Sequence, residues 1–133
     1  MINTPLNRLD IVVVDFGPLV KSSSIQRLVR PALVLQPSSM NNSSTTTIVC
    51  PLSSVKKKLY LPYHIVIKKR FGLHKDSVAL LEQTTVIDQL MIKKHIGHID
   101  DASVVAKIDK GLLATLGISE SIISTSALTQ RGY

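Results

Sequence analysis

The chain has 133 residues, with 16 Lys or Arg against 9 Asp or Glu, so its formal charge is +7 at pH 7. This length fits one small domain, and 44% hydrophobic against 19% charged residues excludes general disorder and a coiled coil. The longest uncharged stretch, residues 31–55, is rich in Ser, Asn and Thr, which excludes a membrane helix of about 20 apolar residues. At the start, residues 1–5 lack the basic and apolar regions of a secretory signal. We therefore expect a basic cytoplasmic protein.

Strand-forming segments fill most of the chain. Residues 9–16 form a β-branched apolar run that Gly17 and Pro18 end, which predicts a first core strand. Residues 17–29 are small and polar and then basic, which predicts a long loop, and a loop of this length in a small domain suggests function. The polar residues 37–46 predict a surface loop. The further predicted strands cover residues 31–35, 47–50, 61–67, 77–83 and 93–99.

One helix is predicted near the end of the chain. Asp100 and Asp101 offer an N-cap, the apolar residues that follow recur at steps of three and four, and Gly117 is expected to end the helix. About six short strands and one C-terminal helix predict a mainly β fold of the α+β class, a small twisted barrel whose closure removes exposed edges. We divide the chain into an extension (1–9), a folded domain (10–118) and a flexible tail (119–133).

Several common kinds of site are absent from the sequence. The single cysteine, Cys50, excludes intramolecular disulfides and multi-thiolate metal sites, and its apolar neighbours predict a buried residue. No Gly-rich phosphate loop, His-Glu-x-x-His, Gly-x-Ser-x-Gly or Asp-x-Asp cluster is present, which disfavours nucleotide hydrolysis and metal-dependent nuclease activity. His95 and His98 are three residues apart in an extended segment, so we expect them to point to opposite faces. We expect neither a metal nor a cofactor.

Five motifs occur in a fixed order along the chain. They are Asp-Ile-Val-Val-Val-Asp-Phe-Gly-Pro at 10–18, Arg-Pro-Ala-Leu-Val at 30–34 after Ser-Ile-Gln at 24–26, Pro-Leu-Ser-Ser at 51–54, Asp-Ser-Val-Ala-Leu-Leu-Glu-Gln at 76–83 with Ile-Asp at 87–88, and His-Ile-Asp-Asp at 98–101. In this order and spacing the sequence resembles the MazF/PemK family of toxin endoribonucleases from bacterial type II toxin–antitoxin pairs. The resemblance runs from about residue 10 to residue 118.

The resemblance implies a small SH3-like barrel of the PemK/CcdB type that forms a homodimer. It also implies a metal-independent endoribonuclease that cuts single-stranded RNA, including mRNA, at short sequence motifs. In that family the 2′-hydroxyl of the RNA attacks the adjacent phosphorus and leaves a 2′,3′-cyclic phosphate and a 5′-hydroxyl. A cognate antitoxin silences the enzyme, and we expect its acidic, flexible segment to cover the basic groove.

The family's catalytic positions map onto four residues of this chain. The active-site arginine falls on Arg30, and the catalytic hydroxyl falls on Ser53. A guanidinium presents forked donors to phosphate oxygens and keeps its proton, so we expect Arg30 to act as an electrostatic clamp. Glu82 aligns with an acidic position, and His64 lies where it could act as an acid. The alternatives for these residues are surface ion pairs for Arg30 and Glu82, a turn residue for Ser53 and an ordinary strand residue for His64.

We expect RNA contact where the chain is basic or where the family contacts RNA. These positions are Gln26, Arg27, Ser54, Lys56, Lys57, Lys58, Leu61 and Gln83, and the cations Lys68, Lys69 and Arg70 could rim the groove. Gln83 has the amide needed to read a base edge. Asn41 matches a family asparagine to which the sequence assigns no role.

Two departures from the family pattern bear on activity. The family loop carries glycines before Arg-Pro, whereas residues 27–29 here are Arg-Leu-Val. An expected Arg-Thr pair is Thr85-Val86, which removes a cation and puts the cleavage sequence in doubt. The alternative function is a non-catalytic CcdB-like toxin that poisons DNA gyrase, in which Arg30 and Ser53 would be structural. A generic RNA-binding barrel is a third reading.

Overall fold

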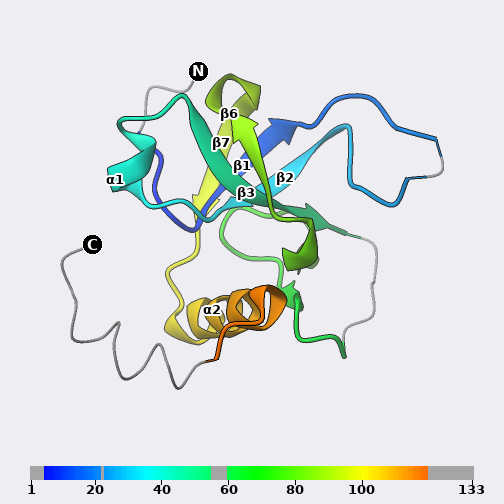
Figure 1. Ribbon diagram of the computed structural model, residues 1–133, viewed down its shortest axis with the longest axis vertical. Coiled ribbons are helices and arrows are strands. Elements are labelled where there is room, and N and C mark those ends of the chain that lie inside the picture. The colour runs from blue at the N-terminus through cyan, green and yellow to red at the C-terminus, as the bar shows by residue number, and fades with distance from the viewer. Residues whose placement is uncertain (1–4, 22, 55–59, 120–133) are drawn as a thin grey trace.

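The structure is a computed structural model that describes residues 5–21, 23–54 and 60–119 (Figure 1). In chain order its elements are β1 (Asp10–Asp15), β2 (Val29–Val34), α1 (Ser38–Asn41), β3 (Thr46–Ser53), β4 (His64–Ile67), β5 (Ser77–Leu80), the 3-10 turn η1 (Leu81–Gln83), β6 (Thr85–Asp88), the 3-10 turn η2 (Gln89–Met91), β7 (Ile92–His98) and α2 (Ala102–Leu116). The mainly β fold with a C-terminal helix is confirmed. Neither helix in these ranges has the length and apolar character needed to cross a bilayer.

The strands form antiparallel pairs in the order β4-β5-β3-β2-β1-β7, and β6 pairs with β3 off this path. The expected closure of the barrel is wrong in detail, because β4 and β7 are the two ends of the path and do not pair. Instead, the turn after β4 packs directly on β7. A Cβ on Gly97 would lie 1.6 Å from the carbonyl oxygen of Phe71, and one on Gly72 would lie 1.9 Å from that of Ile96. The two glycines therefore allow two backbones to meet where strand pairing stops.

The sheet buries both of its faces. Ile11, Leu33 and Leu52 belong to one apolar cluster, which α2 covers through Ile108. Val12, on the opposite side of β1 from Ile11, belongs to a second cluster with the other faces of β2 and β3. Burial on both sides explains the continuous β-branched run in the first strand. Cys50 lies in the first cluster, as predicted, and its burial raises the pKa of the thiol to about 12.

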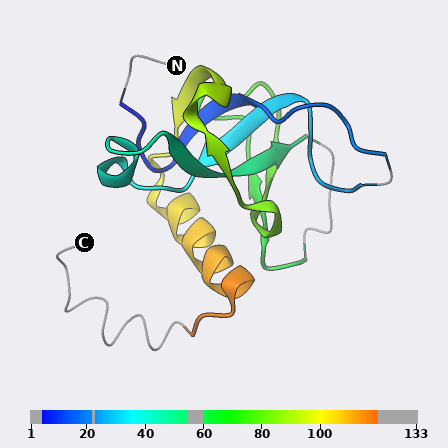
Figure 2. The same ribbon diagram turned by 45° about the horizontal axis from the view of Figure 1, so that its top comes forward.

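Helix α2 begins and ends as the sequence predicts. The Asp101 carboxylate accepts hydrogen bonds from the backbone N–H groups of Ser103 and Val104, at 2.9 and 3.3 Å, and Gly117 ends the helix with φ at 70°. Figure 2 shows α2 beneath the sheet with its C-terminal end toward η1. A Cβ on Gly111 would lie 2.6 Å from a side-chain atom of Leu81. The helix therefore packs closely against the turn that carries Glu82 and Gln83.

The segment predicted as a polar surface loop, residues 37–46, contains the short helix α1. Its buried Asn41 is the centre of a hydrogen-bond network. The Asn41 side-chain oxygen accepts from Gln36 at 2.8 Å and from Thr47 at 2.7 Å, and its nitrogen donates to the carbonyl oxygens of Leu6 and Gln36, both at 2.9 Å. Asn41 therefore joins the N-terminal segment to β3, which gives a structural role to a residue that the sequence left unassigned.

The prediction that His95 and His98 point to opposite faces is wrong. The pairing of β1 with β7 shifts register between Ile11 and Val12, so the side chains of β7 do not alternate regularly. Both imidazoles reach the buried Asp10 carboxylate: Nε2 of His95 lies 3.2 Å from one oxygen and Nδ1 of His98 lies 2.7 Å from the other. The sequence also missed β6, because a strand of four residues with three exposed side chains gives no alternating pattern.

We predict that Asp101→Ala lowers the melting temperature at pH 7, because it removes the cap of α2. Hydrogen bonds from Ser103 and then Arg70 hold the pKa of Asp101 well below its ordinary value of 3.8. A depressed pKa contributes its full stabilisation above the ordinary value, and this contribution declines as the pH falls from the ordinary value toward the depressed pKa of the folded state. Thermal unfolding at pH 7 and pH 3 should show a difference from the native protein that shrinks in acid. Asp100→Ala is the matched control and should change little.

Candidate active site

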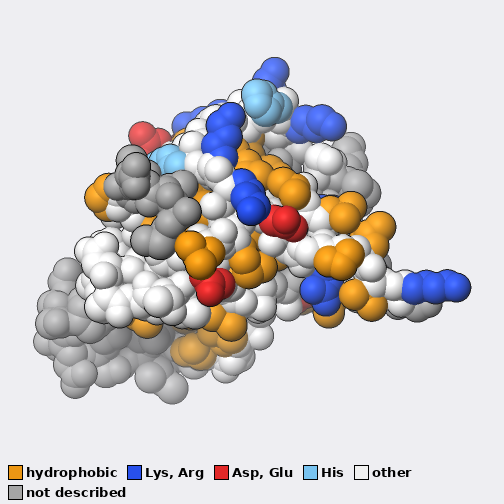
Figure 3. Space-filling view, turned by 90° about the horizontal axis from the view of Figure 1, so that it is seen from above, with side chains coloured by type: hydrophobic (Ala, Val, Ile, Leu, Met, Phe, Trp, Pro, Cys, Tyr) orange, Lys and Arg blue, Asp and Glu red, His pale blue; other side chains and the backbone are white. Residues whose placement is uncertain are grey.

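The predicted long loop is confirmed. It leaves β1 at Phe16 and returns at Leu28, and the N–H of Phe16 donates to the carbonyl oxygen of Leu28 at 2.9 Å. The loop projects from the sheet (Figure 1) and exposes apolar side chains, among them Leu19, Val20 and Ile25. Figure 3 shows hydrophobic side chains gathered on the side of the molecule from which the loop projects, interrupted by Lys and Arg. This exposed apolar character is unusual beside a basic surface and marks the loop as a contact region.

Arg30 and Ser53 lie on one face of the sheet. The register of β2 with β3 pairs Ala32 with Pro51, and Arg30 and Ser53 each lie two residues further along these strands. Because side chains alternate with a period of two, both extend from the same face as Ala32 and Pro51. Ser53 is buried, whereas Arg30 is half-buried. The two residues that the family resemblance singled out therefore extend from the same face, although the paired stretch itself ends at Ala32 and Pro51 and Ser53 pairs with Val78 of β5.

The Arg30 guanidinium is held by its own loop. Its Nε donates to the carbonyl oxygen of Arg27 at 2.8 Å, and one Nη donates to the side-chain oxygen of Gln26. An arginine side chain has five N–H donors, so within the described part of the chain three of them remain for an anion. Gln26 thus orients Arg30 and leaves most of its hydrogen-bonding capacity unused. Such a guanidinium can take two oxygens of one phosphate.

Gln83 fastens the loop to η1. Its side-chain oxygen accepts from the backbone N–H of Gln26 at 2.8 Å, and its nitrogen donates to the carbonyl oxygen of Ser24 at 3.2 Å. The oxygen and the nitrogen of the Gln83 amide, which the sequence assigned to base reading, are therefore both hydrogen-bonded to the loop backbone. Base reading by Gln83 stays a prediction, and it would require these two bonds to open.

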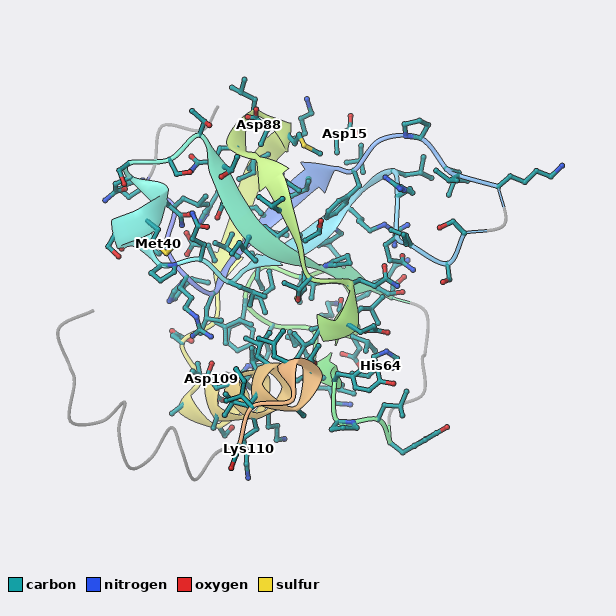
Figure 4. All side chains as sticks on the ribbon, viewed as in Figure 1. Asp15, Met40, His64, Asp88, Asp109 and Lys110 are labelled. Atoms are coloured by element: carbon teal, nitrogen blue, oxygen red, sulfur yellow. The ribbon has the colours of Figure 1, made fainter. Side chains whose placement is uncertain are left out.

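Glu82, the neighbour of Gln83, pairs with His64. Nε2 of the imidazole lies 2.6 Å from a carboxylate oxygen, and the His64 side chain is 7% exposed against 37% for Glu82. The Tyr63 ring meets the imidazole edge to face, with centroids 5.1 Å apart. In Figure 4, His64 lies far from Met40 of α1, on the side where the loop projects. Two neighbouring residues of η1 therefore hold two parts of the site: Glu82 pairs with His64, and Gln83 binds the loop that precedes Arg30.

A cavity of about 410 Å³ opens beside Arg30 and Ser54. We call it the Arg30 cavity, and its basic side chains come from the β4–β5 turn and from β7: His74, Lys75 and Lys94. The sequence did not single out these three residues, because no motif contains them and only the fold brings the two segments together. They surround the cavity with donors suited to a polyanion.

The remaining predicted RNA contacts are more scattered. Leu61 is half-buried, and its carbonyl oxygen accepts from the N–H of His64 at 3.1 Å. Arg70 pairs with Asp101 at 3.0 Å and lies over the Phe71 ring, 4.5 Å from its centroid, so it supports α2. Lys56, Lys57 and Lys58 lie outside the described residues. Within the described ranges, no group of three or more His, Cys, Asp or Glu side chains is arranged to hold a metal ion.

Residues 7–116 match the model of the PemK-like, MazF-like toxins of type II toxin-antitoxin systems. The chain belongs to this family. It is 38% identical to Endoribonuclease EndoA of Bacillus subtilis over 114 residues, which cover 85% of this chain and 96% of EndoA. Its fold is similar to that of MazF from Deinococcus radiodurans, with a TM-score of 0.70 and 24% identity over 87% of this chain and all of that one. It is also similar to a mycobacterial endoribonuclease in complex with its cognate antitoxin, with a TM-score of 0.70 and 14% identity over 86% of this chain and 97% of the other.

We predict that Gln83→Ala loosens the loop. The substitution removes the acceptor of the Gln26 N–H and the donor to Ser24, so this part of the loop opens more often. Hydrogen exchange followed by NMR should show the Gln26 amide exchanging at least ten times faster than in the native protein. Val86→Ala changes an exposed residue of β6 three positions after Gln83, and as the control it should leave the exchange rate of the Gln26 amide unchanged. Equal exchange in the native and Gln83→Ala proteins would mean that Gln83 does not hold the loop.

Proposed function

We propose that this protein is the toxin of a type II toxin–antitoxin pair and that it cuts single-stranded RNA, including mRNA, in the cytoplasm. The observation that supports this best is the turn η1, which joins two groups with complementary chemistry. Gln83 binds the backbone of Gln26, whose side chain accepts a hydrogen bond from Arg30, and Glu82 pairs with the His64 imidazole. The turn η1 therefore positions both the Arg30 guanidinium, which would stabilise charge, and the His64–Glu82 pair, which would transfer protons.

The proposed reaction needs no nucleophile from the protein. The ribose 2′-hydroxyl attacks the adjacent phosphorus, the P–O5′ bond breaks, and the products are a 2′,3′-cyclic phosphate and a 5′-hydroxyl. One proton leaves the 2′-oxygen and one is added to the 5′-oxygen, so the protein must accept a proton and supply one. The RNA atoms and these two protons balance the step without a metal, a cofactor or water.

Arg30 serves the phosphorus. Negative charge on the non-bridging oxygens grows as the fifth bond forms, and donors fixed in advance stabilise this charge most. The bonds to Arg27 and Gln26 fix the guanidinium before RNA arrives. Ser53, on the same sheet face, adds a hydroxyl donor.

His64 and Glu82 serve the protons. Imidazoles are the side chains that most often transfer protons in catalysis, and the Glu82 carboxylate on Nε2 of His64 holds the orientation of the ring. In this assignment Glu82 accepts the proton of the 2′-hydroxyl and the protonated His64 supplies the proton of the leaving oxygen. Arginine keeps its proton at ordinary pH, so this pair takes the role that Arg30 cannot.

The partners follow from the same surface. A net charge of +7 favours RNA, and basic side chains line the Arg30 cavity. The exposed apolar side chains of the loop suit a second copy of the chain and the antitoxin. A solved relative of the same fold is an endoribonuclease in complex with its cognate antitoxin, which supports an antitoxin as partner.

We predict that Arg30→Ala lowers kcat/KM for RNA cleavage about 100-fold or more, because it removes charge stabilisation at phosphorus. The assay uses a long single-stranded RNA in EDTA, with the ends mapped and tested for 5′-hydroxyls. Arg30→Lys keeps the charge but loses the fork and should fall between the two, and Ser53→Ala should give a smaller, clear loss. Melting curves of all variants report folding. Native-rate cutting by folded Arg30→Ala would contradict the mechanism.

We predict that Glu82→Gln lowers kcat about 100-fold with little change in KM, because it keeps the shape of the side chain but removes the proton acceptor. Single-turnover cleavage of a short RNA measures the chemical step. Asp88→Asn, an exposed carboxylate of β6, is the matched control and should cut at the native rate. Intact RNA with native protein, together with blocked DNA supercoiling, would instead favour the CcdB-like alternative.

A further inference from the structure

A second cavity, of about 370 Å³, is lined by residues of η1 but not by His64. We call it the Arg27 cavity. It is bounded by the loop on one side and by β6 and η2 on the other, through Phe16, Arg27, Pro51, Thr85, Ile87 and Met91. Gln26, Glu82 and Gln83 also reach it, so it adjoins the groups proposed to cut RNA. Nothing in the proposed chemistry uses this space.

The lining of the Arg27 cavity suits a flat ring with a polar edge. Phe16, Pro51 and Ile87 are buried apolar residues that supply the apolar part of the lining. Polar groups stand beside it: the Thr84 hydroxyl donates to the carbonyl oxygen of Leu81 at 2.7 Å and keeps its capacity to accept, and Thr85 is exposed. Apolar walls with a few polar groups are typical of small-molecule sites, and the volume exceeds that of a nucleobase.

Arg27 is the cation of this lining, and Glu82 is its carboxylate. Its Nε is shielded from solvent and has no hydrogen-bond partner among the described residues. No ion pair within these ranges neutralises it. A shielded donor without an acceptor costs free energy, so a reorientation of the guanidinium toward acceptor atoms in the cavity is favourable. This Nε of Arg27 therefore lies in a residue that lines a cavity next to the groups proposed to react.

We propose that the Arg27 cavity holds one base of the RNA next to the cut phosphate, and that Arg27 selects guanine there. Guanine presents two neighbouring acceptors, O6 and N7, on one edge, and the forked guanidinium matches this pair. Adenine places an amino donor at the position of O6 and is rejected. The apolar residues of the cavity contact the ring faces. This inference rests on the proposed ribonuclease function and adds a specificity-determining residue to it.

The test is a cleavage library in which the positions flanking one cut are randomised, and the cut fraction is sequenced. The native protein should prefer guanine at one flanking position. Arg27→Ala should lower that preference at least tenfold while cleavage of RNA continues, and Arg27→Lys should lower it too because it lacks the fork. Lys21→Ala removes a cation from the same loop at a position that does not line the cavity, and it should keep the native preference.

A rescue separates reading from loop structure. Thr85 of β6 lines the same cavity as Arg27, so the double variant Arg27→Ala with Thr85→Arg returns a guanidinium to this cavity from another element. Restored guanine preference supports the inference. An unchanged preference in Arg27→Ala overturns it, including when the same variant escapes inhibition by the antitoxin, which would assign the cavity to a protein partner. If native protein cuts no RNA, the proposed function itself fails.

Discussion

The two hydrogen bonds of the Gln83 side chain join residues 57 and 59 positions apart in the chain and fix the position of the loop between β1 and β2. Gln26, held by Gln83 through its backbone, accepts from Arg30 through its side chain. The backbone of Arg30 is placed by β2, which pairs it with Val14, and its guanidinium is oriented through Gln26 by η1. A guanidinium on a long flexible chain would otherwise lose much of its value as a fixed donor.

The support of η1 comes from beneath. Leu81 is fully buried, its N–H donates to the carbonyl oxygen of Tyr63 at 3.0 Å, and Gly111 of α2 lets the helix approach it. The helix is fixed in turn by Asp101, which Arg70 reaches from the β4–β5 turn. Residues outside the site thus fix the position of the turn that contains Glu82 and Gln83. Arg70, which the sequence grouped with the RNA contacts, therefore binds Asp101 at the start of α2.

The sequence was sufficient for the features that depend on local pattern. The apolar run of β1, the caps of α2 and the long loop follow from residue types and spacing, and the motif order led to Arg30, Ser53 and Glu82. Features that depend on pairing were not predictable in this way: the register shift that brings His95 and His98 to Asp10, the open edge between β4 and β7, and the four residues of β6. The two departures from the family pattern also looked unrelated in the sequence, yet Arg27 and Thr85 line one cavity.

Cys50 has a practical consequence. It is the single thiol of the chain, it has no exposed surface, and its raised pKa keeps it protonated at neutral pH. Thiol-reactive dyes need an accessible thiolate, so the folded protein should be silent toward maleimides. A cysteine introduced at the tip of the loop would then be the sole labelling site, and fluorescence could follow loop opening without first removing the native residue.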